Sequence, residues 1–335
     1  MKYNYLGITG LCVSEIGFGG IPIQRITKDE AAKVIQRAQE LGINFIDTAR
    51  GYTVSEEYIG YALKGRRDKW IIASKSMVRD KSLMDKEIDI SLKNLNTDYI
   101  ELYQIHNVKD IATYDKVISK DGAYEALYKA KIKGKIGHIG ITVHSADILK
   151  KVVESRLFET IMFPYNIVET QGEDIFKRAK ELNIGVIAMK PLAGGTIRDA
   201  YLAIKFILQN KNVATVIPGM ASINEVEENV LAAEKGNLSQ SEIEMCKKIS
   251  KEIGQNFCRR CGYCAPCPQG IDISFCFLLK LYYDNYNLKD WATERYKDLK
   301  AHAEDCKECG ICEEKCPYNL PIREKLKEVK TVFGF

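Results

Sequence analysis

The chain has 335 residues, of which 46% are hydrophobic and 28% charged, a composition typical of a globular protein and not of a disordered or fibrous one. Its 49 Lys and Arg residues nearly balance 45 Asp and Glu residues, for a net charge of +4, which gives no electrostatic case for nucleic acid or an anionic membrane as partner. The start, Met1–Gly10, lacks the pattern of a secretion signal, and no apolar run is long enough to cross a bilayer. We therefore expect a cytoplasmic protein.

The eleven cysteines are unevenly distributed along the chain. Cys12 and Cys246 stand apart, and the other nine lie between Cys258 and Cys316. In a chain without an export signal, closely spaced thiols are better interpreted as metal ligands than as disulfides, because the cytosol keeps thiols reduced. The clustering indicates a separate metal-binding module.

Short β-branched or apolar runs alternate with longer amphipathic stretches over residues 16–219, which is typical of successive βα units. Before them, residues 2–14 turn at Gly7–Gly10 and predict a hairpin at the bottom of the fold. Eight strands are predicted, at Ile16–Gly19, Ile43–Asp47, Trp70–Ser74, Ile100–Ile105, Ile136–Ile141, Ile161–Pro164, Ile184–Met189 and Val213–Ile217. Eight parallel strands, each followed by a helix, close into a barrel, whereas a doubly wound sheet usually has fewer.

Side chains that accept hydrogen bonds from the first amides of a helix mark helix starts. Three such signals are Thr27 with Glu30, Ser82 with Asp85, and Ser239 with Glu242. The last opens a helix that leads into the cysteine module. We therefore expect a barrel at residues 1–238 and a linker helix with a small α-helical, ferredoxin-like domain at residues 239–335.

Polar side chains follow the predicted strands, and in a barrel of parallel strands the reactive groups lie at these ends. Asp47 ends the second strand in Asp-Thr-Ala-Arg-Gly-Tyr, which contains Tyr52, while Lys75 ends the third strand and His106 the fourth. This order resembles the catalytic tetrad of the aldo-keto reductases, an Asp-Thr-Ala-x-x-Tyr motif followed by a strand-end Lys and a strand-end His. The resemblance covers roughly residues 1–235 and implies a (β/α)8 TIM barrel.

The resemblance also implies an oxidoreductase that reduces a carbonyl or oxidises an alcohol. Reduction needs a hydride on carbon and a proton on oxygen, and a tyrosine with a pKa of about 10 is a poor acid unless a cation stabilises its phenolate. Lys75 would be that cation, and Asp47 would keep it charged. His106 would hydrogen-bond the substrate oxygen, and Tyr52 would donate the proton.

The nicotinamide contacts of the family are partly present. Where the family has a Ser-Asn pair, a Gln and a stacking Tyr, this chain has Thr142 with Val143, Met162 and Met189. A hydroxyl is retained, while two amide side chains and an aromatic face are absent, so nicotinamide would bind through backbone groups and Met189. His144 follows the fifth strand and could line the pocket.

The family pairs the 2′-phosphate of NADPH with a Lys and an Arg after the eighth strand. Here Gly219 and Glu225 stand near those positions, and a carboxylate would repel the phosphate. Glu228 and Asn229 match the adenine-binding Glu-Asn of the family. The resemblance therefore implies NAD(H) or NADP(H) as cofactor, with NAD(H) preferred.

Eight cysteines form two runs that each end before a Pro: Cys258, Cys261, Cys264 and Cys267, then Cys306, Cys309, Cys312 and Cys316. The second has the spacing of bacterial ferredoxins, and the last gap of the first is one residue shorter. We expect two 4Fe–4S clusters, one held by the first three cysteines of the first run with Cys316, the other by the first three of the second run with Cys267. Zinc is the alternative, but its sites usually take two pairs separated by a longer loop.

The other three cysteines, Cys12, Cys246 and Cys276, are interpreted as small buried hydrophobes. Cys276 lies in an apolar helical stretch at residues 275–279. We expect this helix to dock the cysteine module onto the barrel.

Two functions remain open. The first is a nicotinamide-dependent carbonyl reductase or alcohol dehydrogenase whose clusters transfer electrons. The second is a redox enzyme whose barrel the clusters feed through a flavin or a partner protein. Hydride transfer moves two electrons and a cluster usually one, so coupling them needs an intermediary. A sensor or regulatory subunit is disfavoured by the complete tetrad. The expected partners are a small carbonyl or alcohol and an electron-transfer protein.

Overall fold

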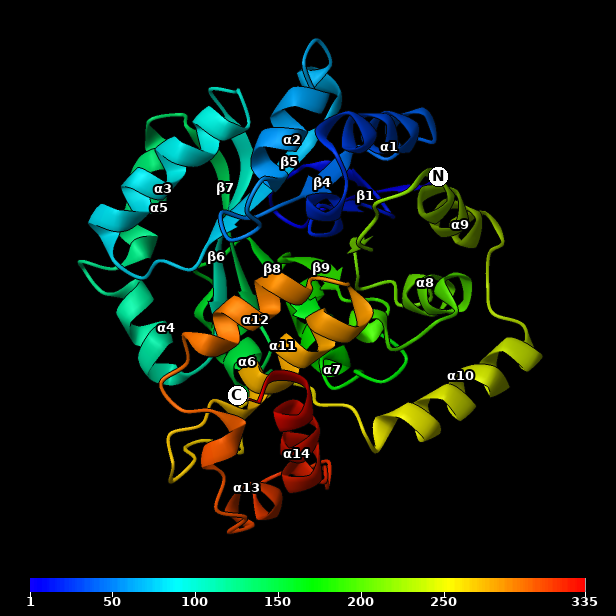
Figure 1. Cartoon of the computed structure of the whole chain (residues 1–335). Helices are drawn as coiled ribbons and strands as arrows, with labels where there is room; N and C mark the ends of the chain where they lie inside the picture. The colour runs from blue at the N-terminus through cyan, green and yellow to red at the C-terminus, as the bar shows by residue number, and fades with distance from the viewer. Residues whose placement is uncertain (335) are drawn as a thin grey trace.

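The computed structural model describes residues 1–334. Its centre is a sheet of eight parallel strands in the order β10-β9-β8-β7-β6-β5-β4-β3 (Figure 1). The strands are β3 (Phe18–Gly19), β4 (Phe45–Asp47), β5 (Ile71–Ser76), β6 (Ile100–Val108), β7 (Ile136–Val143), β8 (Thr160–Pro164), β9 (Gly185–Met189) and β10 (Thr215–Ile217). Bridges from Ile16 to Val216 and from Gly19 to Gly219 join the two edge strands. The sheet closes almost completely, and the predicted (β/α)8 barrel is confirmed.

Helices surround this barrel. They are α1 (Lys28–Glu40), α2 (Ser55–Ala62), α3 (Lys81–Asn94), α4 (Ile111–Ile118), α5 (Ala123–Ile132), α6 (Ala146–Ser155), α7 (Glu173–Glu181), α8 (Ala200–Leu208) and α9 (Ile223–Glu234), with the short 3-10 helices η1 (Pro22–Arg25), η2 (Arg67–Lys69) and η3 (Ala193–Gly195). Thr27 and Glu30 form the predicted capping box. The prediction that Ser82 caps α3 is wrong, because a bridge to Gly122 holds Asp80 extended and the helix begins directly after it.

The N-terminal hairpin of β1 (Tyr3–Tyr5) and β2 (Cys12–Ser14) closes the bottom of the barrel. Leu6 and Val13 are fully buried and pack with Phe45, Leu102 and Ile187 from the barrel strands. The predicted hairpin is therefore confirmed. Cys12, however, is exposed, so its interpretation as a buried hydrophobe is wrong. On strand β2 side chains alternate, and Val13 takes the inward position.

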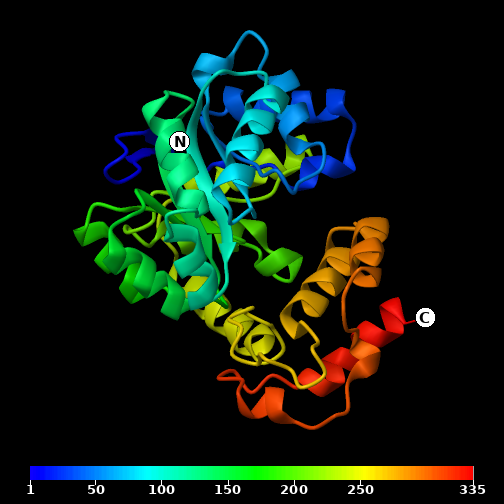
Figure 2. The ribbon, with the colours of Figure 1, turned by 90° about the vertical axis from the view of Figure 1, so that its left-hand side faces the viewer.

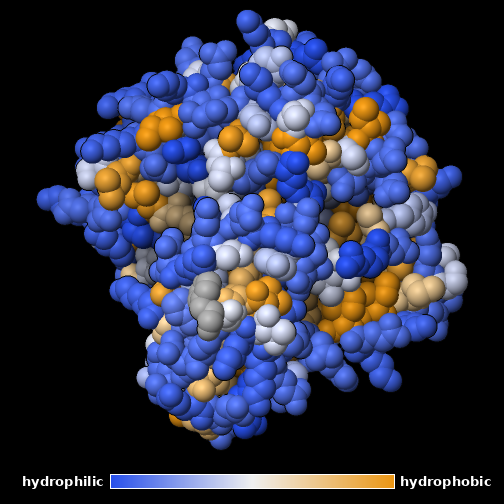
Figure 3. Space-filling model, in the orientation of Figure 1, coloured by the Kyte–Doolittle hydropathy of each residue, from blue (hydrophilic) through white to orange (hydrophobic). Residues whose placement is uncertain are grey.

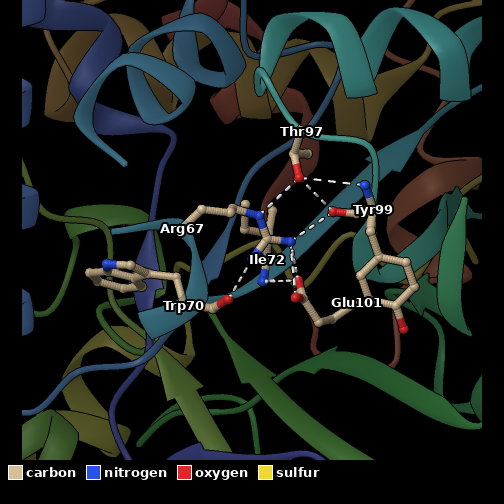
Figure 4. A network of polar contacts seen from close by, with 6 residues as sticks. All are labelled: Arg67, Trp70, Ile72, Thr97, Tyr99 and Glu101. Atoms are coloured by element: carbon tan, nitrogen blue, oxygen red, sulfur yellow. Dashed lines mark hydrogen bonds and ion pairs between the residues drawn. The ribbon is translucent and has the colours of Figure 1, made fainter. Parts of the chain in front are cut away.

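A polar network also holds the bottom end of β5 and β6 together (Figure 4). The guanidinium of Arg67 donates to both carboxylate oxygens of Glu101 at 2.9 and 2.8 Å, and to the carbonyl oxygens of Trp70 and Tyr99 at 2.7 Å. Glu101 in turn accepts the Ile72 amide at 2.8 Å. These groups lie at the end where barrels of this class concentrate stabilising rather than reactive residues.

The C-terminal part of the chain is helical. It contains α10 (Gln240–Gly254), α11 (Ile273–Asn285), α12 (Lys289–Lys297), η4 (Ala303–Asp305), α13 (Ile311–Glu314) and α14 (Ile322–Phe333). Helices α11, α12 and α14 share a core that includes Cys276, Leu279, Tyr296 and Val329. Figure 2 shows this cysteine module beside the barrel, with α11 and α12 nearest to it.

Helix α11 docks the module onto the barrel, as predicted. Asn285 Nδ2 donates to the Gly194 carbonyl oxygen at 3.0 Å, and Arg25 Nη1 donates to the Tyr286 carbonyl oxygen at 3.3 Å. Gly194 has φ +70°, and a Cβ there would lie 2.6 Å from a Leu281 methyl carbon. The two hydrogen bonds join the module to Gly194 and Arg25, which lie in segments that follow barrel strands. The module therefore lies at the C-terminal mouth of the barrel (Figure 1).

Helix α10 leads from the barrel to the module. It begins with the predicted capping box of Ser239 and Glu242 and buries Cys246 in a cluster with Leu202 and Ala203 of α8. Figure 3 shows hydrophobic side chains gathered along α10. The division at residue 238 stays a prediction.

None of the helices in residues 1–334 is both long and apolar enough to span a membrane.

Candidate active site and cluster module

The centre of the site is an ion pair between adjacent strands. Lys75 Nζ lies 2.5 Å from Asp47 Oδ2, and the two side chains are 2% and 4% exposed. The ammonium also donates to the Thr48 carbonyl oxygen at 2.9 Å. Burial raises the pKa of Asp47 and lowers that of Lys75, and their mutual attraction opposes both shifts. Because β4 pairs with β5 in parallel, both groups are held at the same end of the barrel.

Sequence reasoning missed a third member of this group, Gln104. It lies on β6, is fully buried, and donates from Nε2 to Asp47 Oδ1 at 3.2 Å. Each carboxylate oxygen of Asp47 therefore has its own donor. The sequence contains a signal for Gln104. It precedes His106 by two residues, so both side chains face the same side of the strand.

Tyr52 and His106 complete the predicted set around Lys75. The Lys75 ammonium lies 5.0 Å from the centre of the Tyr52 ring. The Tyr52 and His106 rings meet edge to face, with centroids 6.0 Å apart. His106 Nδ1 is buried without a hydrogen-bond partner in the described chain. The structure thus brings all four predicted residues together, and their catalytic roles stay a prediction.

The pKa of Tyr52 is shifted in the opposite direction to the one expected from the sequence. Burial, followed by the nearby Asp47 and Tyr286, raises the pKa of Tyr52 above its usual value. The sequence argument expected Lys75 to lower it, but the charge of Lys75 is balanced by Asp47. Burial and the nearby Lys75, Arg79 and Lys190 lower the pKa of His106 well below its usual value. At neutral pH the phenol therefore keeps its proton and the imidazole is uncharged.

The cysteine module contributes to this mouth. Tyr286 is close enough to Tyr52 to affect its pKa, and Tyr52 in turn affects the pKa of Tyr282. The Tyr282 and Tyr286 rings are 5.1 Å apart. No local sequence signal marks these tyrosines, because their position depends on how α11 docks.

The predicted nicotinamide positions are divided between the mouth and the core. Thr142 is buried, and its hydroxyl accepts the Asn107 amide at 2.7 Å. Met162 is fully buried with the hairpin residues at the lower end of the barrel, and Met189 is 8% exposed in the same cluster. Of these residues, Met189 ends β9, and the role of all three in binding nicotinamide stays a prediction.

The predicted dinucleotide loop follows β10. A Cβ at Gly219 would lie 2.6 Å from Pro22 Cγ, so the loop packs tightly there. Glu225 accepts the Ala221 and Ser222 amides at 2.6 and 3.1 Å and thus caps α9. Glu228 is exposed, whereas Asn229 is 3% exposed and its Oδ1 is without a partner in residues 1–334. That orphaned amide oxygen fits an adenine amino group.

The eight cysteines surround two cavities of the module. One cavity is lined by Cys258, Cys261, Cys264 and Cys316. The other is lined by Cys267, Cys306, Cys309 and Cys312, and also by Cys264. These are the two groups that the sequence assigned to the two clusters, and four thiols around each cavity are the donor set that a cubane takes. The ligand assignment itself stays a prediction.

Comparison with known proteins identifies the barrel. Residues 15–202 and 200–251 match the aldo/keto reductase family. The chain belongs to this family. It is 30% identical to L-galactose dehydrogenase of Arabidopsis thaliana over 284 residues, which are 69% of this chain and 88% of the relative. It is 26% identical to the uncharacterized oxidoreductase YqkF of Bacillus subtilis, over 75% of this chain and 97% of that protein.

Solved aldo-keto reductase structures agree with the fold. That of AKR11C1 from Bacillus halodurans superposes with a TM-score of 0.64 and 29% identity, covering 74% of this chain and 96% of that one. Residues 257–321 match a 4Fe–4S dicluster domain. The protein is thus an aldo-keto reductase-like oxidoreductase with a C-terminal dicluster domain, and members of its barrel family typically use nicotinamide cofactors on small carbonyl substrates.

Proposed function

We propose that the protein reduces a carbonyl group of a small molecule, or oxidises the corresponding alcohol, with a nicotinamide cofactor, NAD(H) preferred. The observation that carries this proposal is the convergence of Tyr52 and His106 on the buried Lys75–Asp47 pair at the C-terminal mouth. Polar groups at that end of a barrel belong to its chemistry.

A bound dinucleotide would supply or accept the hydride. Tyr52 donates its phenolic proton to the substrate oxygen, and its raised pKa keeps that proton in place before reaction. Lys75 lies beside the ring and stabilises the phenolate once the proton has left. Neutral His106 positions the substrate oxygen by donating a hydrogen bond. Met189, Thr142 and Asn229 would hold the dinucleotide.

The dicluster module would transfer electrons one at a time, so its coupling to the two-electron hydride chemistry of the barrel would need an intermediary. The alternative is that the clusters feed the barrel through a flavin or a partner protein instead of nicotinamide. Anaerobic purification followed by identification of the bound organic cofactor separates the two.

The variant Tyr52→Phe tests the chemistry. It keeps the ring and removes the transferable proton. Turnover should fall by roughly 100-fold to 10,000-fold, the usual contribution of a positioned general acid, while iron content and fold are unchanged. The matched control is Tyr61→Phe on α2, an exposed tyrosine that bonds Asp29. Full activity in Tyr52→Phe would mean that the chemistry lies elsewhere.

A further inference from the structure

The two residues beside Lys75 on β5 face away from the barrel interior, because side chains alternate along a strand. Both of them, Ser74 and Ser76, are buried. Ser74 Oγ donates to Oε1 of Glu56 on α2 at 2.7 Å, and Ser76 Oγ donates to Oε2 of Glu87 on α3 at 2.9 Å. Two carboxylates from the surrounding helices therefore hold the strand end on which Lys75 lies.

Arg50 joins these two carboxylates. Its Nη1 donates to Glu56 Oε2 at 3.0 Å, and its Nε lies 3.4 Å from Glu87 Oε2. The Arg50 backbone amide also donates to the Lys75 carbonyl oxygen at 3.0 Å. Arg50 is thus attached to β5 twice, directly through its backbone and, through the two carboxylates, to both serines that flank Lys75.

The anchor of Arg50 is itself held in place. Besides the Ser74 hydroxyl and the Arg50 guanidinium, Glu56 accepts Asn94 Nδ2 at 3.1 Å, and its side chain is 1% exposed. A buried carboxylate with donors on both oxygens has a fixed position. The planar guanidinium of arginine presents its donors in fixed directions and can meet two carboxylates at once, whereas a lysine ammonium is a point charge on a flexible stem.

Arg50 belongs to the loop that carries Tyr52, residues 48–54 between β4 and α2. These residues form neither helix nor strand. Thr53 has φ +42°, a left-handed conformation that is rare for a β-branched residue and persists only where the surroundings hold it. The Thr53 hydroxyl donates to Gln24 Oε1 at 2.7 Å. Tyr52 therefore lies between two anchored residues, Thr53 on one side and Arg50 on the other.

We propose that Arg50 is a positioning residue for the reaction: it fixes the loop of Tyr52 to the strand end of Lys75 and so keeps the phenol beside the ammonium. The inference rests on the proposed carbonyl chemistry, in which the phenol loses its proton next to that ammonium. The Lys75 ammonium lies 5.0 Å from the centre of the Tyr52 ring. A displacement of about 1 Å in such an arrangement can cost roughly 100-fold in rate.

The test reports on the Tyr52 ring itself. The cluster-loaded, full-length protein is prepared with tyrosine labelled by ¹³C at Cζ, and the Tyr52 signal is the one that Tyr52→Phe removes from the NMR spectrum. Arg50→Met should shift, split or broaden that signal, because the ring is then no longer held in one place beside Lys75. Glu87→Gln removes one of the two charges that hold Arg50 and keeps an acceptor for Ser76, so it should produce the same change to a smaller extent.

Turnover is measured with NADH and 4-nitrobenzaldehyde. Arg50→Met should lower kcat by roughly 10-fold to 100-fold and leave the KM of the aldehyde unchanged, because position matters for the transition state and not for ground-state binding. In the Tyr52→Phe background the same substitution should cost little more, since groups that act as a unit are not additive. Loss of the same factor in both backgrounds would mean that Arg50 acts independently of Tyr52, and would overturn the proposal.

The matched control is Arg67→Met (Figure 4). Arg67 also pairs with a carboxylate next to β5, that of Glu101, which accepts the Ile72 amide. The side chains of Arg67 and Arg50 are 26% and 20% exposed, but Arg67 lies at the opposite end of the barrel. Arg67→Met should lower the midpoint of urea unfolding, as Arg50→Met does, and leave the Tyr52 signal and kcat unchanged.

The proposal fails if Arg50→Met and Glu87→Gln both leave the Tyr52 signal unchanged. It also fails if Arg67→Met changes the signal to the same extent, since the signal would then report stability and not position. If Arg50→Met does not fold, Glu87→Gln decides on its own. The spectra need no substrate, so they test the role of Arg50 even if Tyr52→Phe keeps full turnover and the carbonyl chemistry is withdrawn.

Discussion

Lys75 and Asp47 form a buried ion pair at 2.5 Å across the strands β4 and β5. Gln104 and the Thr48 carbonyl oxygen complete the hydrogen bonds around them. Removing one member of such a pair leaves an uncompensated charge in a region that excludes water, which costs more than the pair itself contributes.

We therefore predict that Asp47→Asn destabilises the barrel by about 3 to 5 kcal/mol, the range for a broken buried pair. The double variant Asp47→Asn/Lys75→Met should be less destabilised than the sum of its single variants, because no lone charge is then buried. Urea unfolding under anaerobic conditions measures both. Additive losses would show that the two groups do not interact strongly.

The dinucleotide preference has its own test. NADH should bind more tightly than NADPH, and Glu225→Gln should narrow the difference, because the amide keeps an acceptor for the Ala221 and Ser222 amides while the charge is lost. Gly219→Lys should not create NADPH binding, since its Cβ would collide with Pro22. Fluorescence titration of both dinucleotides measures this. Tighter NADPH binding in the wild type would contradict the assignment.

The cavities predict how the clusters respond to single substitutions. Protein prepared without oxygen should contain about eight irons and eight sulfides, as expected for two cubanes. Cys316→Ser should remove the cluster of the cavity that also contains Cys258, and Cys312→Ser the cluster of the other. Iron analysis with electron paramagnetic resonance distinguishes the two. About four irons in the wild type, or stoichiometric zinc, would be the contrary result.

The two mouth histidines predict a dependence of stability on pH. Burial lowers the pKa of His106 and His144 below the usual value of about 6.5. The unfolded chain then binds more protons than the folded one, so their contribution to stability is present above pH 6.5 and is lost as pH falls. The loss is at most about 1.4 kcal/mol per pH unit for each histidine. His144→Asn should flatten the slope of unfolding free energy between pH 6.5 and 5. An unchanged slope would assign the loss to other groups.

Much of the barrel could be predicted from local pattern. Each strand is a short β-branched run, and the strand-end rule found Asp47, Lys75 and His106. The same rule applies to Lys190, which directly follows the seventh predicted strand, whereas the family resemblance points to Met189 beside it. Strand ends were less accurate. The first strand was predicted at Ile16–Gly19, but it begins only at Phe18. Ile16 forms an isolated bridge to Val216 instead.

What could not be predicted depends on contacts between distant parts of the chain. Nothing near Tyr286 in the sequence indicates that it lies close to Tyr52. Its position follows from the close approach of Leu281 to Gly194 and from the Asn285 hydrogen bond. The raised pKa of Tyr52 has the same origin, because it depends on burial.

The docking of α11 links the shape of the barrel mouth to the condition of the iron–sulfur clusters, which oxygen damages. The helix belongs to a module against whose core six of the eight predicted cluster cysteines pack, so oxidative loss of the clusters would loosen the helix and with it Tyr282 and Tyr286. The barrel, with its own core, would survive that damage. We expect oxygen-damaged protein to keep an intact tetrad under an uncovered mouth, and therefore to accept a wider range of molecules than the intact enzyme does.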